Sequence, residues 1–488
     1  RPGRFASKDK EQRLLLGRYG RSTISLSQRL QQQNVLLTAM IGSGKTFGLV
    51  MRNLLRERGL RSLFVSDVKA ELVRKTAGSL SRFYEIWVFS PLQAGKSDGY
   101  NPLMHVHNAQ DALQLAQCWA NNTGDSKGGD ATFWMALVIR ALNATILHLR
   151  AAEPDAPFSR LADMLSQSTY EELREVLMAS PSMIARREAQ QFFDALDRND
   201  KIVAGLMADL GTRFQLFLDE NVRVTTAHNT IDFVAMAERP IALFLAIPPR
   251  GAEMCAPLLA CFVSHMWNEW ELRAEQEPDG VLPLKVECYL DEFANLGRIY
   301  NLKEHLTTMR HTGVGLIIIL QSFSQIDDLY GEALRNILLT NCGTHLLLPG
   351  AGLEETRFYS ERVGDTTVKT TSATKSGTGL FLEQRSWTTS ETRRRLFTAE
   401  ELRTMERNQM LVLGSAAAPI LVTTQSYEQD RAVRHLADLP FARVTVCPQP
   451  STPPPFTVSG LGGDDSQQKQ PGPTIIVDAD DHSGLAPE

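Results

Sequence analysis

Residues 34–46 read NVLLTAMIGSGKT, and this stretch decides the fold. Its apolar start predicts a buried strand over 34–38, and the apolar spacing that follows predicts a helix over 47–58. Gly42 and Gly44 lie between the two, where they let backbone N–H groups fold around an anion at the positive end of the helix dipole. A strand, a glycine-rich turn and a helix in this order are typical of a site that holds the phosphates of a nucleotide.

The turn itself supplies the predicted nucleotide-binding residues. Lys45 is expected to reach the β- and γ-phosphates of ATP, and the Thr46 hydroxyl is expected to bind Mg²⁺. Ala39 takes the place of the first glycine in the pattern G-x-x-x-x-G-K-[ST], which it tolerates at negative φ. The alternative is a turn that only packs a helix on a strand. The full predicted set is Ala39, Met40, Ile41, Gly42, Ser43, Gly44, Lys45 and Thr46.

A second apolar run, 286–290, ends in Asp291-Glu292. Carboxylates at the end of a buried strand are costly unless they serve a metal or a water molecule. We expect Asp291 to hold Mg²⁺ through water and Glu292 to orient and deprotonate the attacking water. The alternative is that Asp291 caps the segment that follows.

A third apolar run, 316–320, ends in Gln321 and is expected beside the Asp291 strand. Gln321 would then face the γ-phosphate, where it would sense that group or place the water. The alternative is a polar strand end with no role.

Composition limits the class of protein. The 488 residues carry a formal net charge of −5, which excludes a strongly basic nucleic-acid binder and leaves only a local patch or a pore for such contacts. None of the six cysteines forms a Cys-x-x-Cys pair, so no zinc is expected. Apolar runs stay shorter than about 18 residues, so no membrane-spanning helix is expected.

Changes in composition and in the spacing of apolar residues along the chain predict four regions. Strands alternate with helices in 1–103 and again in 237–447, which predicts two parts of one α/β nucleotide-binding domain with a mostly parallel sheet. Residues 104–236 show helical spacing almost throughout and predict an inserted all-α domain. Residues 366–392 are rich in Thr and Ser and predict an exposed hairpin. The proline- and glycine-rich acidic stretch 448–488 predicts a disordered tail.

These motifs together resemble the VirD4/TraG/TraD coupling proteins of type IV secretion and conjugation. The stretch from Asp291 to Gly297, DEFANLG, is similar to the acidic (Walker B) signature of that family. Five further blocks keep the family's order and spacing: 67–72, 100–103, 133–134, 320–331 and 392–402. Met40-Ile41 departs from the family, which commonly has Pro-Thr there.

The resemblance implies a RecA-like P-loop NTPase domain with an all-α insertion, ATP and Mg²⁺ as cofactors, and a hexamer around a pore. It also implies a place at the cytoplasmic face of the bacterial inner membrane, usually through an N-terminal anchor. Because the sequence begins at Arg1, we expect that anchor to be missing from it. The implied partners are inner-membrane components of the secretion system and a cargo of single-stranded DNA with its relaxase, or effector proteins.

Ring motors place the γ-phosphate at a subunit boundary, where an arginine of the neighbouring subunit neutralises charge. The family places such an arginine at Arg310, which is therefore a predicted catalytic residue together with Glu292, Lys45 and Gln321. A plain helix-terminal cation is an equal alternative for Arg310. Arg335 and Arg357 are weaker candidates.

The preferred function is a coupling-protein ATPase that recruits DNA–protein or protein substrates and helps to translocate them. Two alternatives stay open at this point. One is a double-stranded DNA translocase of the FtsK/HerA type, and the other is a nucleotide-bound docking platform that does not hydrolyse ATP.

Overall fold

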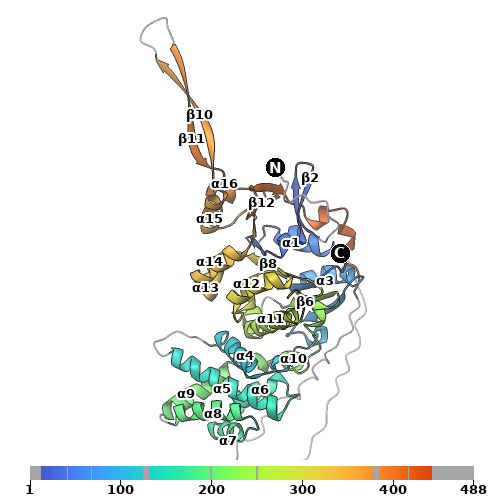
Figure 1. The fold of residues 1–488 in the computed structure, drawn as a ribbon, viewed down its shortest axis with the longest axis vertical. Helices are drawn as coiled ribbons and strands as arrows, with labels where there is room; N and C mark the ends of the chain where they lie inside the picture. Colours follow the sequence, from blue (N-terminus) through green and yellow to red (C-terminus); the bar gives the residue numbers. More distant parts are fainter. Residues whose placement is uncertain are drawn as a thin grey trace, which may run out of the picture. The chain divides into compact units, whose positions relative to one another are not determined.

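The alternation of apolar runs and helical segments builds an eleven-stranded sheet in the computed structural model (Figure 1). The structure describes residues 13–441 except 41, 68, 125–130, 198–199, 249–250, 377–383 and 416. Residues 1–450 belong to one compact unit. The predicted tail, 448–488, lies outside the described residues.

The sheet is parallel over seven strands and antiparallel over the remaining four. Its order is β2-β1-β13-β12-β9-β3-β8-β7-β4-β6-β5, in which β9 through β5 run parallel. The strands are β1 Leu14–Tyr19, β2 Ser22–Leu26, β3 Val35–Thr38, β4 Ser62–Asp67, β5 Glu85–Phe89, β6 Ile241–Ala246, β7 Val286–Leu290, β8 Val314–Leu320, β9 Thr344–Leu347, β12 Gln409–Gly414 and β13 Ile420–Thr423.

Helices cover both faces of this sheet because its central strands are apolar on both sides. In β8, Leu316, Ile318 and Leu320 join one hydrophobic core while Ile317 and Ile319 join the other. The helices that belong with the sheet are α1 Gln28–Gln31, α2 Met51–Leu54, α3 Glu71–Leu80, α11 Ala252–Glu275, α12 Leu302–Thr312, α13 Ser324–Tyr330, α14 Glu332–Asn341, α15 Leu353–Val363 and α16 Ala399–Arg403.

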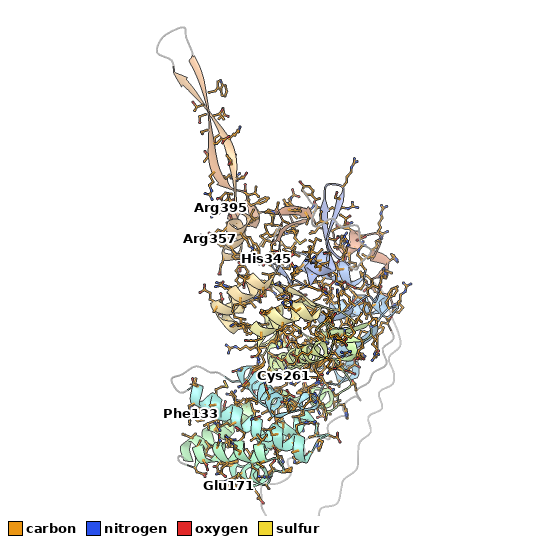
Figure 2. The ribbon with its side chains drawn as sticks, in the orientation of Figure 1. Phe133, Glu171, Cys261, His345, Arg357 and Arg395 are labelled. Atoms are coloured by element: carbon orange, nitrogen blue, oxygen red, sulfur yellow. The ribbon has the colours of Figure 1, made fainter. Side chains whose placement is uncertain are left out.

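The stretch predicted to be an all-α insertion contains helices and no strand among its described residues. They lie together beyond α11 (Figure 1), against which α4 packs. Figure 2 labels Phe133 and Glu171 among them, and Cys261 in α11. The helices are α4 Ala109–Asn121, α5 Ala131–Ala152, α6 Phe158–Gln167, α7 Tyr170–Met178, α8 Met183–Leu196, α9 Asp200–Thr212 and α10 Glu220–Thr225.

One helix, α5, is long and apolar enough to cross a membrane by length and composition alone. Within the structure, 61% of its most apolar window is buried. That degree of burial is typical of a core helix.

The Thr- and Ser-rich segment forms the predicted hairpin, with strands β10 Asp365–Ser376 and β11 Gln384–Arg395 in one antiparallel register. It projects from the part of the chain that carries α15 and α16 (Figure 1). Thr398 caps α16 and exchanges hydrogen bonds with Glu401, as the capping-box pattern predicts.

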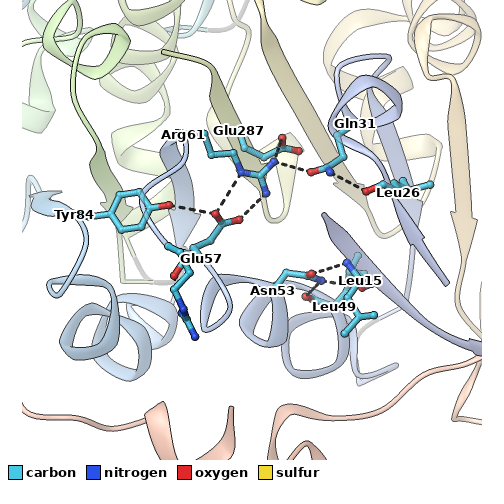
Figure 3. Close-up of polar contacts among 10 residues, drawn as sticks. Leu15, Leu26, Gln31, Leu49, Asn53, Glu57, Arg61, Tyr84 and Glu287 are labelled. Carbon is cyan, nitrogen blue, oxygen red and sulfur yellow. Dashed lines mark hydrogen bonds and ion pairs between the residues drawn. The ribbon is translucent and has the colours of Figure 1, made fainter. Parts of the chain in front are cut away.

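A buried ionic network lies at the amino end of β4 (Figure 3). The Arg61 guanidinium donates to Glu57 at 2.6 Å and to Glu287 at 2.6 Å, and it also donates to Gln31 at 2.7 Å. The Tyr84 hydroxyl donates to Glu57 at 3.2 Å. These groups join α1, α2, β4 and β7 at the edge of the sheet where the parallel strands begin. The carboxyl ends of the same strands lie at the opposite edge.

Candidate active site

The glycine-rich turn follows β3 directly and leads into a π-helical turn, η1 Thr46–Val50, which continues as α2. Ala39 is buried and its N–H donates to the carbonyl of Leu320 at 2.9 Å, which fastens the turn to β8. Gly42 and Gly44 have φ of +80° and +83°. A Cβ at either position would meet nothing within 4 Å, so backbone conformation and not space calls for glycine there. Met40 is exposed and Ile41 lies outside the described residues.

The acidic pair meets this turn across the carboxyl edge of the sheet. Lys45 Nζ lies 3.2 Å from Asp291 Oδ1 and 3.5 Å from Glu292 Oε1. The Thr46 hydroxyl donates to Asp291 Oδ2 at 3.4 Å. Burial raises the pKa of Asp291 above its ordinary value and the Lys45 cation opposes that rise. Four predicted residues from two segments, 245 positions apart, are thus brought together.

Glu292 is also contacted by Gln321, because the strands that precede these two residues are neighbours, as the sequence predicts. β7 and β8 are paired in parallel, and both Glu292 and Gln321 follow their carboxyl ends. Gln321 Nε2 donates to Glu292 Oε1 at 2.9 Å. Glu292 has φ of +54°, a left-handed conformation that is uncommon outside glycine and points to a functional constraint.

The arginines lie outside this cluster. Arg310 is exposed in the last turn of α12, just before β8 begins, so the seven residues of β8, about 23 Å of strand, separate it from the carboxyl edge. Arg335 pairs with Asp327 at 2.7 Å and Glu354 at 2.5 Å. Arg357 is exposed on α15 (Figure 2). Any role for Arg310 at a γ-phosphate therefore requires a second copy of the chain.

A cavity of about 230 Å³ opens between the turn and the acidic pair. Its wall includes Asp67, Lys69 and Glu71, to which sequence reasoning gave no role. Asp67 ends β4, beside β7, and accepts backbone hydrogen bonds from Glu71 at 3.0 Å and Val73 at 2.8 Å. Burial raises the pKa of Asp67 to about 6. The signal that could have found it is an acidic residue at the end of a buried strand, the same signal that identified Asp291.

The residues of this cavity fit a triphosphate with a bound Mg²⁺. Among the described residues that line it, Lys45 Nζ and Asp291 Oδ1 are buried without a hydrogen-bond partner, although the Lys45 ammonium keeps its charge contact with Asp291. No described group of three or more His, Cys, Asp or Glu side chains is arranged to hold an ion alone. Such a set is not required, because Mg²⁺ usually keeps several waters and uses the substrate's phosphates as ligands.

A second cavity of about 250 Å³ borders the same turn and shares Gly44 and Phe47 with the first. Its wall also includes Met410 of β12 and the two residues just before that strand, Arg407 and Asn408.

Comparisons with known proteins agree with this arrangement. A family model described as type IV secretory system conjugative DNA transfer matches residues 6–448. Protein VirD4 of Agrobacterium fabrum is 25% identical over 431 residues, which cover 86% of this chain and 62% of that protein. The conjugal transfer protein TraG of Escherichia coli is 25% identical over 398 residues, which cover 76% of this chain and 61% of that protein. The chain therefore spans less than two thirds of either relative.

Among solved structures, the plasmid coupling protein TrwB in complex with ADP and Mg²⁺ matches with a TM-score of 0.66 at 17% identity. The match covers 87% of this chain and 91% of that one. This likeness establishes the fold, which is a RecA-like α/β domain with a mostly parallel sheet and an inserted all-α domain, as the sequence predicts.

Proposed function

The chain belongs to the type IV secretory system conjugative DNA transfer family, and from that premise we propose that it is the ATP-hydrolysing motor part of a coupling protein. The observation that carries the proposal is the meeting of Lys45 with Asp291 and Glu292 at 3.2 and 3.5 Å, at the mouth of a cavity that adjoins a helix start. A positive charge, a metal-ligating carboxylate and a carboxylate base are what phosphoryl transfer to water requires.

In this proposal each side chain acts on a different part of the substrate. Lys45 and the N–H groups of the turn bind the β- and γ-phosphates. Thr46 and Asp291 would hold Mg²⁺, which supplies charge neutralisation for the phosphate oxygens. The nucleoside occupies the cavity beside Phe47 and Asn408, since this cavity adjoins the first across Gly44.

Glu292 orients a water molecule and accepts its proton as the water oxygen bonds to the γ-phosphorus. The bond from that phosphorus to the β–γ bridging oxygen breaks, and ADP and phosphate leave. Gln321 holds Glu292 Oε1 and senses whether the γ-phosphate is present. Arg310 of a neighbouring subunit neutralises the charge that develops, which requires a ring, for which the family implies a hexamer.

Membership of the family supports the biological setting that we propose. The motor works at the cytoplasmic face of the bacterial inner membrane with inner-membrane components of a secretion system. It recruits single-stranded DNA with its relaxase, or effector proteins, through the helices of 104–236, and ATP hydrolysis helps to translocate them.

The test is phosphate release from MgATP by the purified chain, with and without single-stranded DNA. We expect turnover that DNA stimulates, and we expect Lys45→Ala to abolish it while Lys303→Ala, on the exposed surface of α12, does not. Stimulation by double-stranded DNA alone would favour a translocase of the FtsK/HerA type. Tight ATP binding without turnover, with any DNA and at any protein concentration, would favour the docking platform.

A further inference from the structure

Two side-chain amides donate hydrogen bonds to the Glu292 carboxylate. One belongs to Gln321, which has a role in the proposed mechanism, and the other belongs to Asn295. Gln321 donates to Oε1, whereas Asn295 Nδ2 donates to Oε2 at 2.9 Å. Both oxygens of the carboxylate thus face an amide N–H, and Lys45 Nζ lies 3.5 Å from Oε1. The carboxylate has one orientation because both partners must be satisfied together.

Asn295 reaches Glu292 because the backbone turns at once after β7. Phe293–Leu296 form a 3₁₀ turn, η7, in which the N–H of Asn295 donates to the carbonyl of Glu292 at 2.8 Å. Side chains three residues apart eclipse each other in this geometry, which brings the amide back over the carboxylate. Phe293 and Leu296 are buried and fix the turn to the core.

The residues after η7 are clamped on two sides. Asn122, at the end of α4, accepts from the N–H of Arg298 at 2.6 Å and donates to its carbonyl at 2.9 Å. The Tyr330 hydroxyl, at the end of α13, donates to the carbonyl of Gly297 at 2.9 Å. Because α4 is the first helix of the inserted region, the position of η7 depends on that region.

We propose that Asn295 is a positioning residue that keeps the Glu292 carboxylate turned towards the attacking water. The inference rests on the proposed function. Without the amide of Asn295, the carboxylate is free to rotate onto the Lys45 ammonium, which is already close. A tighter Lys45–Glu292 pair would remove the base from the water without removing the phosphate-binding backbone of the turn.

The test uses the full chain and two substitutions at one position. Asn295→Asp keeps the shape, loses the N–H donor and adds a charge beside Glu292, whereas Asn295→Ala only loses the donor. We expect Asn295→Asp to lower kcat about 10–100-fold, with KM for MgATP within about twofold of wild type, and Asn295→Ala to lower kcat less. Asn336→Asp, exposed on α14, is the matched control and should keep wild-type kcat.

A residue that only filled space would give the opposite order, because the isosteric aspartate would be tolerated better than alanine. Asn295→Asp with wild-type kcat, or with a smaller loss than Asn295→Ala, would therefore overturn the inference while wild-type turnover keeps the proposed function intact. On a Glu292→Gln background, neither change at Asn295 should lower kcat further. A wild-type chain that never hydrolyses ATP would overturn both the inference and the function beneath it.

Discussion

Replacing Arg61 by leucine should cost the fold a large part of its stability. The side chain of Arg61 is 1% exposed, and its partners Glu57 and Glu287 are 1% and 2% exposed (Figure 3). Leucine fills much of the space but leaves two carboxylates in the core without a cation. Removing one partner of a buried ion pair is costly because the remaining charge has lost its water and gains nothing in return.

The size of the loss follows from the charges that remain. Breaking a buried pair costs about 3–5 kcal/mol. Burial raises the pKa of Glu287 to about 7 although the Arg61 cation opposes the rise. Without that cation the pKa rises further, so at the lower pH this carboxyl group is neutral in the variant and escapes part of the cost. Glu57 keeps a hydrogen bond from Tyr84 at 3.2 Å. We therefore expect Arg61→Leu to lower the free energy of unfolding by about 4 kcal/mol at pH 8, and by less at pH 6.

The assay is urea denaturation followed by tryptophan fluorescence at both pH values. Arg160→Leu is the matched control, because Arg160 pairs with Glu153 at 3.2 Å on the surface, where both side chains are at least 40% exposed. It should cost about 0–1 kcal/mol. A loss for Arg61→Leu no larger than that of the control would refute the view that this network depends on its guanidinium.

Three further predictions concern stability. Glu287 binds a proton more tightly in the folded state, so its contribution to the free energy of unfolding falls as the pH rises from its ordinary pKa of 4.5 to about 7. Between pH 5 and pH 8, the free energy of unfolding of Glu287→Gln should therefore gain about 3 kcal/mol relative to wild type in the same denaturation assay. Arg56 and Arg52 hold the pKa of Asp430 at about 2, although burial of the carboxyl group acts in the opposite direction. In thermal scans by circular dichroism, Asp430→Asn should therefore have a lower melting temperature than wild type at pH 7 and the same melting temperature near pH 2. Gly78→Ala should lower the free energy of unfolding despite the helix propensity of alanine, because a Cβ there would lie 2.0 Å from the carbonyl oxygen of Leu439. Gly205→Ala, exposed in α9 with only ordinary contacts, should raise the free energy of unfolding by about 0.5–1 kcal/mol. Equal effects of the two substitutions would contradict this packing.

Much of the fold could be predicted because its strands are short, apolar and buried on both faces. The run predicted over 34–38 is β3, and those predicted over 286–290 and 316–320 lie within β7 and β8, side by side as expected. The first two strands were missed, because β1 and β2 form an antiparallel hairpin at the sheet's edge whose exposed ends interrupt the apolar pattern. The helical stretch after β8 is divided into α13 and α14, because Gly331 between them takes a φ of +82°.

The sequence predicted which residues lie together at the site where several of them occur in one short segment or at the ends of neighbouring strands. Lys45 and Thr46 follow the glycines directly, and Asp291, Glu292 and Gln321 end neighbouring strands, so topology alone brings them together. Asp67 and Asn295 were missed as site residues for different reasons. Asp67 joins the wall because β4 lies beside β7, and Asn295 reaches Glu292 through a 3₁₀ turn that no spacing rule indicates. The catalytic role of Arg310 stays a prediction. The positions of the region boundaries at 103, 236 and 447 stay predictions as well.

In the proposed mechanism, Glu292 removes a proton from water while Lys45 and its turn hold the triphosphate. The most direct measurement is the rate of phosphate release from bound MgATP by Glu292→Gln, with the affinity for ATP measured in parallel. We expect wild-type affinity and a rate at least about 100-fold lower. Phosphate release at the wild-type rate from a fully bound Glu292→Gln chain would contradict the account.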